Sequence, residues 1–433
     1  MGLKSWILLL AVLATTCEPL FSTFVGSSSI LTTNWLVLPP VLAYLLVSGQ
    51  ADFNEFIRRN WLVLPFFFLC FICQVGYQFK VSGLTLSDEL SATSVTFLTT
   101  LAAYFIFYNL VRTRQDLKRY VNYVGFGTLL ASGALAAITL GLIQVGYLNT
   151  SRGAGHEEVV RYGLGDPNIT YAFVAAGGCL WVTLTNKRWL SHKWRLLASA
   201  LCLGGAFLPI FYGISRGALV TLGAGLLLSG FFIAWHLRAG ALARYVLLGA
   251  FVGTVGLTQV NQKLFDRVME RWTGVTFEGQ MEASAGTRVS SLDWLAHEML
   301  SPDLYGKGYI NFEEQTGLHT FSHISYADAY IYGGFFAMLS LMAFLLRTGW
   351  RAAIGIRLET DDDTKVNRIF VVVHAFMFLM MWLTLSMLTM KIIWMALAVL
   401  ARTTALQEEP PPLLAEQDQS SVQYEDHYSA VHG

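Results

Sequence analysis

Long uninterrupted apolar runs recur along this chain, and they constrain its fold more than any other feature of the sequence. In lipid every backbone N–H and C=O needs an internal partner, so a run of roughly 17–25 apolar residues predicts a transmembrane helix. Twelve such runs occur in the 433 residues. We predict helices centred near Leu10, Leu38, Leu69, Leu101, Ala134, Gly177, Gly205, Leu226, Gly249, Phe335, Phe378 and Ala396.

The composition also points to lipid as the solvent for much of the surface. Residues of the set AVILMFWYC make up 54% of the chain, and charged residues make up 13%, which is about half the share typical of soluble domains. A formal net charge of zero argues against bulk nucleic-acid binding. The five cysteines lie in or beside apolar runs and do not indicate a disulfide framework. We interpret Cys70 and Cys73 as small apolar residues of one helix rather than as a metal or redox pair.

Basic residues are divided unevenly between the two sets of loops. With the N-terminus inside, the inner loops and both tails hold 19 of the 29 Lys and Arg residues, and the outer side holds 10. Half of the outer ten lie in one long loop, to which the positive-inside rule applies only weakly. The sequence therefore predicts an all-α, polytopic membrane protein of about 12 helices with both termini in the cytoplasm.

The chain divides into four predicted parts. Residues 1–258 hold helices 1 to 9, residues 259–322 form a large outer loop, residues 323–402 hold helices 10 to 12, and residues 403–433 form a polar, disordered cytoplasmic tail. A loop of this length in a compact protein is usually functional. Two amphipathic helices are expected in it, because apolar residues recur there at helical spacing. These residues are Val260, Leu264, Val268 and Trp272, and then Val289, Leu292, Leu295 and Met299.

Three arginines far apart in the sequence fall on the outer side: Arg161, Arg216 and Arg288. Each has a structural alternative, since Arg161 can pair with Asp166, Arg216 can reach lipid headgroups, and Arg288 can belong to a solvated helix face. Together they would repel one another without an anion, and arginine suits bidentate recognition of phosphate. We therefore predict a diphosphate site. Outer carboxylates show no metal-binding spacing, so no obligatory divalent ion is expected.

His323, at the end of the loop, is the predicted general base. An unperturbed imidazole has a pKa near 6.5 and can take a proton from a hydroxyl group at neutral pH. The structural alternative is a histidine that bonds backbone or headgroups at a helix N-terminus. His319 and Asp166 are weaker candidates for the same role. Lys80, after the third helix, is either a fourth cation for the diphosphate or an ordinary solvated lysine.

The order of these motifs resembles the O-antigen ligase and O-antigen polymerase superfamily, and the resemblance runs from Arg161 to Gly334. It rests on Arg161 with Gly163-x-Gly165-Asp166-Pro167-Asn168, Ser215-Arg216-Gly217-Ala218, Arg288 with Trp294, Tyr305-Gly306-x-Gly308, and His323 with Gly334.

The resemblance implies a glycosyltransferase of the bacterial inner membrane with a periplasmic active site. Its donor would be a glycan on undecaprenyl diphosphate, and the acceptor of a ligase would be a sugar of lipid A-core in lipopolysaccharide biosynthesis. Transfer would be inverting and independent of metals and cofactors. Arg161, Arg216 and Arg288 would hold the diphosphate, with His323 as base and Asn168 as a supporting residue.

One departure from the family pattern keeps alternatives open. Ligases place Asn, Ser or Gln directly after this histidine, whereas this chain has Ile324, and Ser325 would replace the polar group in part. An O-antigen polymerase is therefore an alternative to the ligase. A protein O-oligosaccharyltransferase would share the chemistry with another acceptor. A transporter of lipid-linked glycans is a different class, for which charges at the bilayer midplane and repeat symmetry are expected.

Overall fold

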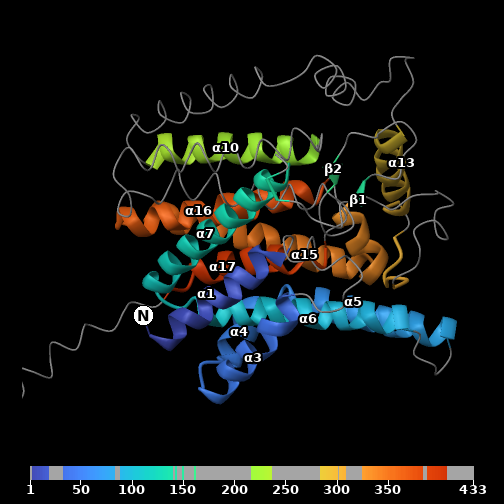
Figure 1. The fold of residues 1–433 in the computed structure, drawn as a ribbon. Coiled ribbons are helices and arrows are strands. Elements are labelled where there is room, and N and C mark those ends of the chain that lie inside the picture. Colours follow the sequence, from blue (N-terminus) through green and yellow to red (C-terminus); the bar gives the residue numbers. More distant parts are fainter. Residues whose placement is uncertain are drawn as a thin grey trace, which may run out of the picture.

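The protein is described by a computed structural model, whose elements are almost all α-helices (Figure 1). The structure describes residues 2–18, 33–82, 88–139, 142–143, 149–150, 160–161, 216–236, 283–300, 302–308, 324–383 and 388–406. Within these ranges two short strands, β1 (Asn149–Thr150) and β2 (Val160–Arg161), pair antiparallel. The predicted all-α class therefore holds for the described residues, with this ribbon as an addition.

The helices fall where the apolar runs predict them. Every predicted centre within the described residues lies inside a helix, whereas those near Gly177, Gly205 and Gly249 lie outside the described residues. The helices are α1 (Leu3–Thr16), α3 (Thr33–Val47), α4 (Phe53–Asn60), α5 (Leu64–Ser82), α6 (Asp88–Leu110), α7 (Arg114–Thr139), α10 (Arg216–His236), α13 (Ala283–Glu298), α15 (Ser325–Leu358), α16 (Asp362–Met381) and α17 (Lys391–Thr403).

Two of the described helices have the length and composition of membrane spans by themselves. In the part of the chain that the structure describes, α15 and α16 are each long and apolar enough to cross a membrane. Helix α4 and residues Leu64–Tyr77 of α5 qualify together as a third span that is bent by 89°. Helix α1 and segments of α3, α6 and α10 are apolar but shorter. The helices are thus compatible with a membrane protein, and the total of twelve stays a prediction.

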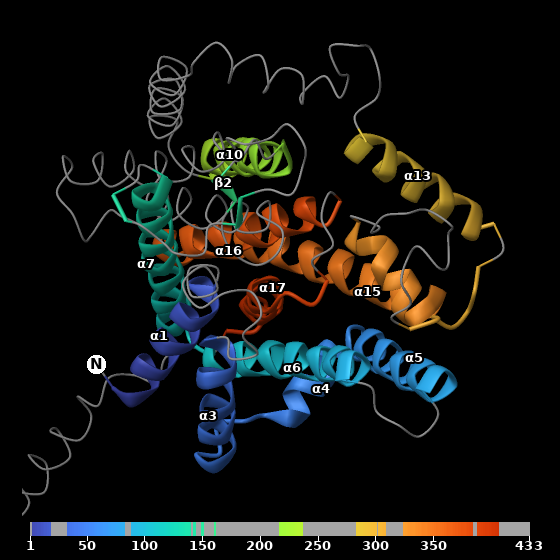
Figure 2. The same ribbon diagram turned by 45° about the vertical axis from the view of Figure 1, so that its right-hand side comes forward.

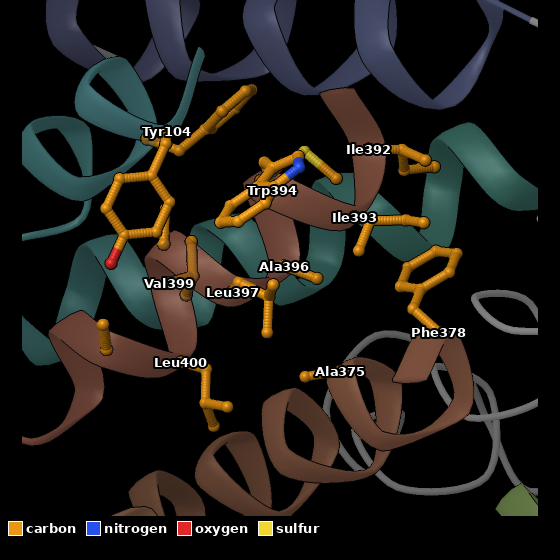
Figure 3. Packing of buried hydrophobic residues seen from close by; sticks show 14 of the residues in the cluster. Tyr104, Ala375, Phe378, Ile392, Ile393, Trp394, Ala396, Leu397, Val399 and Leu400 are labelled. Carbon is orange, nitrogen blue, oxygen red and sulfur yellow. The ribbon is translucent and has the colours of Figure 1, made fainter. Parts of the chain in front are cut away.

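The buried core is centred on Trp394 of α17, which lies among the other helices (Figures 2 and 3). Its ring stacks on Phe66 with centroids 5.7 Å apart and meets the edge of Tyr104 at 5.9 Å. Its indole N–H donates to the carbonyl of Leu388 at 2.6 Å. A buried indole needs this acceptor, because an unpaired donor would cost part of what the aromatic packing contributes.

Helices α15 and α16 run antiparallel and define two ends of the bundle. At one end the buried Glu359 pairs with Arg114 of α7 at 3.4 Å and with Arg368 of α16 at 3.2 Å. At the other end the backbone N–H of Ser325 donates to the carbonyl of Trp382 at 2.9 Å. We call the end with Glu359 the basic end and the end with Ser325 the site end.

The predicted second amphipathic helix of the outer loop is α13. It begins at Ala283, which puts Arg288 in its second turn. Val289 and Leu292 are more than half exposed at 57% and 53%, so part of the predicted apolar face is open. The first predicted amphipathic helix, with Val260 to Trp272, lies outside the described residues, as does the tail beyond 406.

Candidate functional site

The site end is built around a break in α15 at Gly334. This residue has φ 80° and ψ −173°, a conformation that residues with a Cβ rarely adopt. The break turns backbone groups away from the helix toward the segment 302–308. The N–H of Phe335 donates to the carbonyl of Asp303 at 3.0 Å, and the N–H of Lys307 donates to the carbonyl of Ile331 at 2.9 Å. The 302–308 segment is therefore held by the backbone of α15.

Glycines allow the two backbones to touch. A Cβ on Gly306 would stand 2.4 Å from the backbone N of Gly333, and a Cβ on Gly334 would stand 2.4 Å from the carbonyl carbon of Tyr305. Gly308, with φ 78°, lies against α5, where a Cβ would come within 2.7 Å of the Cβ of Tyr77. The motif Tyr305-Gly306-x-Gly308 and Gly334, which the sequence analysis grouped by resemblance, thus form one joint.

Tyr330 of α15 attaches helix α13 to this joint. Its hydroxyl accepts a hydrogen bond from the N–H of Asp303 at 2.8 Å and lies 3.5 Å from a carboxylate oxygen of Glu298, near the end of α13. Its ring meets the edge of Trp294 on α13, with centroids 6.3 Å apart. Helix α13 therefore packs on α15 at the site end, and it brings the backbone of Arg288 with it.

The start of α15 is fixed as firmly as its break. Ile324, which is 2% exposed, precedes the helix in an extended conformation. Ser325 is buried, and its backbone N–H donates to the carbonyl of Trp382. The hydroxyl of Tyr326 donates to the carbonyl of Leu379 at 3.3 Å. Sequence reasoning placed His323 at the opening of this helix. His323 itself lies outside the described residues, but the two residues that follow it are anchored at the site end.

The other predicted site residues are distributed around this end. Lys80 lies exposed in the last turn of α5, the helix whose Tyr77 contacts Gly308. Arg216 is the first residue of α10, and Arg161 is the last residue of β2. The residues outside the described ranges are Asp166, Asn168, His319 and His323.

The structure brings together only some of the elements that carry these residues. Helix α13, residues 302–308, the start of α15 and the end of α5 meet at the site end, with α13 and α5 on opposite sides of α15 (Figure 2). Helix α10, by contrast, packs along α16. Figure 2 shows strand β2, which ends at Arg161, well apart from α13. The meeting of the guanidinium groups of Arg161, Arg216 and Arg288 stays a prediction.

Other polar groups of this end were not anticipated from the sequence. Asp303 and Lys307 form a half-exposed ion pair at 3.1 Å. Asp328, in the first turn of α15, is buried at 6% exposure. The paired glycines of the run Tyr330-Ile331-Tyr332-Gly333-Gly334 were the available signal, because small residues in a membrane helix allow a neighbouring backbone to approach closely.

Among the described residues, no group of three or more His, Cys, Asp and Glu side chains is placed to hold a metal ion. Cys70 and Cys73 are free thiols, and Cys70 is buried beside Gly333, where an added Cβ would lie 2.8 Å from its sulfur. This packing agrees with the interpretation of Cys70 as a small apolar residue.

No protein-family model matches the sequence, and no curated protein matches it.

Proposed function

We propose that the chain is a membrane glycosyltransferase of the O-antigen ligase type, which moves a glycan from undecaprenyl diphosphate to a sugar hydroxyl of lipid A-core. The observation that supports this best is the joint between Gly306 and Gly334. It connects α13, which carries Arg288, to the stretch of α15 that follows His323. The helix that carries Arg288 thus packs on α15 close to the residues that directly follow His323 in the sequence.

The proposed chemistry follows from the charges of the reactants. The acceptor hydroxyl oxygen attacks the anomeric carbon, its proton passes to the imidazole of His323, and the bond from that carbon to the diphosphate oxygen breaks. Negative charge grows on the leaving undecaprenyl diphosphate, so positioned guanidinium groups lower the barrier. In the proposal Arg288 supplies one of them, Arg161 and Arg216 supply others, and Lys80 adds a further cation.

The packing of the site end suits a reaction at a membrane boundary. One face of α15 packs against α5 and α17, and Trp382 and Trp394 are fully buried. Helix α13, in contrast, leaves Val289 and Leu292 exposed, which suits contact with lipid or with a lipid-linked substrate. Under the predicted orientation this end faces the periplasm.

An O-antigen polymerase is the second candidate, and one observation favours it. Ile324 occupies the position after His323 where ligases carry a polar residue, and it is almost fully buried at 2% exposure. Its side chain cannot hydrogen-bond a substrate. A polymerase would use the same donor chemistry, with a second carrier-linked glycan as the acceptor.

Deletion of the gene in its host, followed by analysis of the glycolipids, tests the proposal. We expect lipid A-core without long glycan, together with accumulated undecaprenyl-diphosphate-linked chains. Lipid A-core capped by single repeats would instead identify a polymerase, and loss of glycan from proteins would identify an oligosaccharyltransferase. With purified components, transfer should persist in EDTA, and a strict requirement for a divalent metal would contradict the mechanism.

A further inference from the structure

A second charged site lies at the basic end, remote from the joint. Helices α4, α7, α15 and α16 surround a pocket of about 510 Å³ there. Four arginines and a single carboxylate line it, together with an apolar wall. The charged residues are Arg59, Arg114, Arg351, Arg368 and Glu359, and the apolar residues include Ile354 and Leu358.

The carboxylates around the pocket do not balance its guanidinium groups. Glu359 is shared between Arg114 at 3.4 Å and Arg368 at 3.2 Å. Glu55 is shared between Arg59 at 3.0 Å and Arg402 at 2.6 Å. Four arginines thus line the pocket with Glu359 as the one carboxylate among the lining residues, while Glu55 pairs with Arg59 and Asp361 lies near Arg114. Within the described part of the chain, Arg351 has no carboxylate partner.

Arg368 is held in a position that leaves hydrogen-bonding capacity unused. Gly355 makes room for its guanidinium group, because a Cβ there would lie 2.6 Å from Nη1. Its Nε is buried and has no acceptor among the described residues. Buried donors are normally satisfied, and a guanidinium group with a free donor beside other cations is suited to a phosphate oxygen.

An apolar stripe on α15 leads to the same pocket. Leu346, Trp350 and Leu358 are 70%, 71% and 73% exposed, and Ile354 between them is 40% exposed. Their spacing of four residues places them along one face of the helix. Leu358 and Ile354 also line the pocket, so the stripe and the cationic site are continuous. A free anion has no use for such a stripe, whereas acyl chains would lie along it.

We propose that this pocket binds the phosphate of an anionic phospholipid, with the acyl chains of that lipid along Leu346, Trp350, Ile354 and Leu358. The predicted orientation puts the basic end in the cytoplasmic leaflet. Anionic lipids are abundant there, and basic pockets between transmembrane helices bind their headgroups. This site is independent of the proposed glycosyl transfer.

Native mass spectrometry of the purified full-length protein, titrated with phosphatidylglycerol and with phosphatidylcholine, tests the proposal. We expect selective retention of phosphatidylglycerol and an affinity about tenfold lower in Arg351→Gln, because one charge-assisted contact is lost. Arg351 has no ion pair with any residue that the structure describes, so this variant should fold. Arg357→Gln, an exposed arginine of the same helix that does not line the pocket, should bind like the wild type. The proposal would be overturned if the wild type bound phosphatidylglycerol and phosphatidylcholine equally well. It would also be overturned if Arg351→Gln and Arg357→Gln bound phosphatidylglycerol with the same affinity.

Two further comparisons identify the occupant. The double variant Ile354→Ser with Leu358→Ser should weaken phosphatidylglycerol binding severalfold, and millimolar inorganic phosphate should not displace the lipid. Displacement by phosphate, with no effect of the double variant, would indicate a site for free phosphate. That result would refute lipid binding.

Discussion

The backbones of Gly306 and Gly334 lie against each other, so that a Cβ on Gly334 would stand 2.5 Å from the backbone N of Gly306. These residues belong to different segments, one before and one after the end of the predicted outer loop. Their contact joins the segment that follows α13 to the break in α15. Neither position has space for a side chain, and Gly334 has in addition a positive φ.

Substitution of Gly334 by alanine should therefore disrupt the joint. We expect the positive φ alone to cost about 1–3 kcal/mol, and the clash with the 305–306 backbone to add to it. Thermal unfolding of the purified protein in lipid nanodiscs measures the loss, and glycosyl transfer should fall with it. Gly349→Ala is the matched control, because it lies in the same helix with nothing within 4 Å of the added Cβ. It should be neutral or slightly stabilising, and equal loss in both variants would contradict the role of the joint.

Tyr330→Phe removes the hydroxyl that accepts the N–H of Asp303 and leaves the aromatic contact with Trp294 intact. The unpaired backbone donor should cost about 1 kcal/mol and loosen the attachment of α13. Hydrogen exchange of residues 283–308 should accelerate, and the transfer rate should fall. Tyr305→Phe changes a residue that is 67% exposed and should leave both quantities unchanged. Unaltered exchange in Tyr330→Phe would show that α13 is held by other contacts.

Asp361 links the stability of α16 to pH. Its carboxylate accepts hydrogen bonds from the hydroxyl of Thr364 at 2.6 Å and from its N–H at 2.9 Å, and these bonds lower the pKa of the Asp361 carboxyl. A depressed pKa means that the stabilisation is complete above about pH 4, the usual value for aspartate, and is lost as the pH falls through the folded value.

Asp361→Ala should remove this cap at neutral pH, at a cost of about 1 kcal/mol. Melting temperatures recorded between pH 3 and pH 7 provide the measurement. The difference between wild type and Asp361→Ala should shrink toward acid pH. Asp362→Ala, in the first turn but not at the cap position, should show a smaller effect. A difference that is constant over the whole range would refute the linkage.

His323→Ala should abolish transfer at every pH, because no general base would take the proton of the acceptor hydroxyl. In the wild type the rate should fall as the pH drops below the imidazole pKa. The initial transfer rate of purified protein, measured from pH 5 to pH 9, reports both effects. Retained activity in His323→Ala would move the role of base to another residue, and Asp166→Asn would then be the variant to examine.

The sequence predicted the helices better than the contacts between them. Apolar runs placed helices over Leu69, Phe335 and Phe378, because lipid permits little other structure in such runs. Periodicity reports only local structure, however. It did not predict the short polar helix α4, and it gave no sign that Gly306 and Gly334 meet.

The candidate site was predictable to a similar degree. Resemblance to a family selected Arg288, Gly306 and Gly334 by their order along the chain, and the structure places their segments at one end of the bundle. Tyr330 escaped notice because its role depends on a backbone N–H from a distant segment. The excess of arginines at the basic end was read only as an indicator of orientation, since their gathering around one pocket is a property of the packed helices.

Binding of undecaprenyl diphosphate to the purified protein tests the central claim most directly, because it isolates recognition of the diphosphate from the chemistry. Arg288→Gln should bind at least tenfold more weakly than the wild type while its melting temperature is unchanged. Lys307→Gln, which removes an exposed cation of the same end that is paired with Asp303, should bind as the wild type does. Undiminished affinity in Arg288→Gln would contradict the assignment of the site end to a lipid-linked diphosphate.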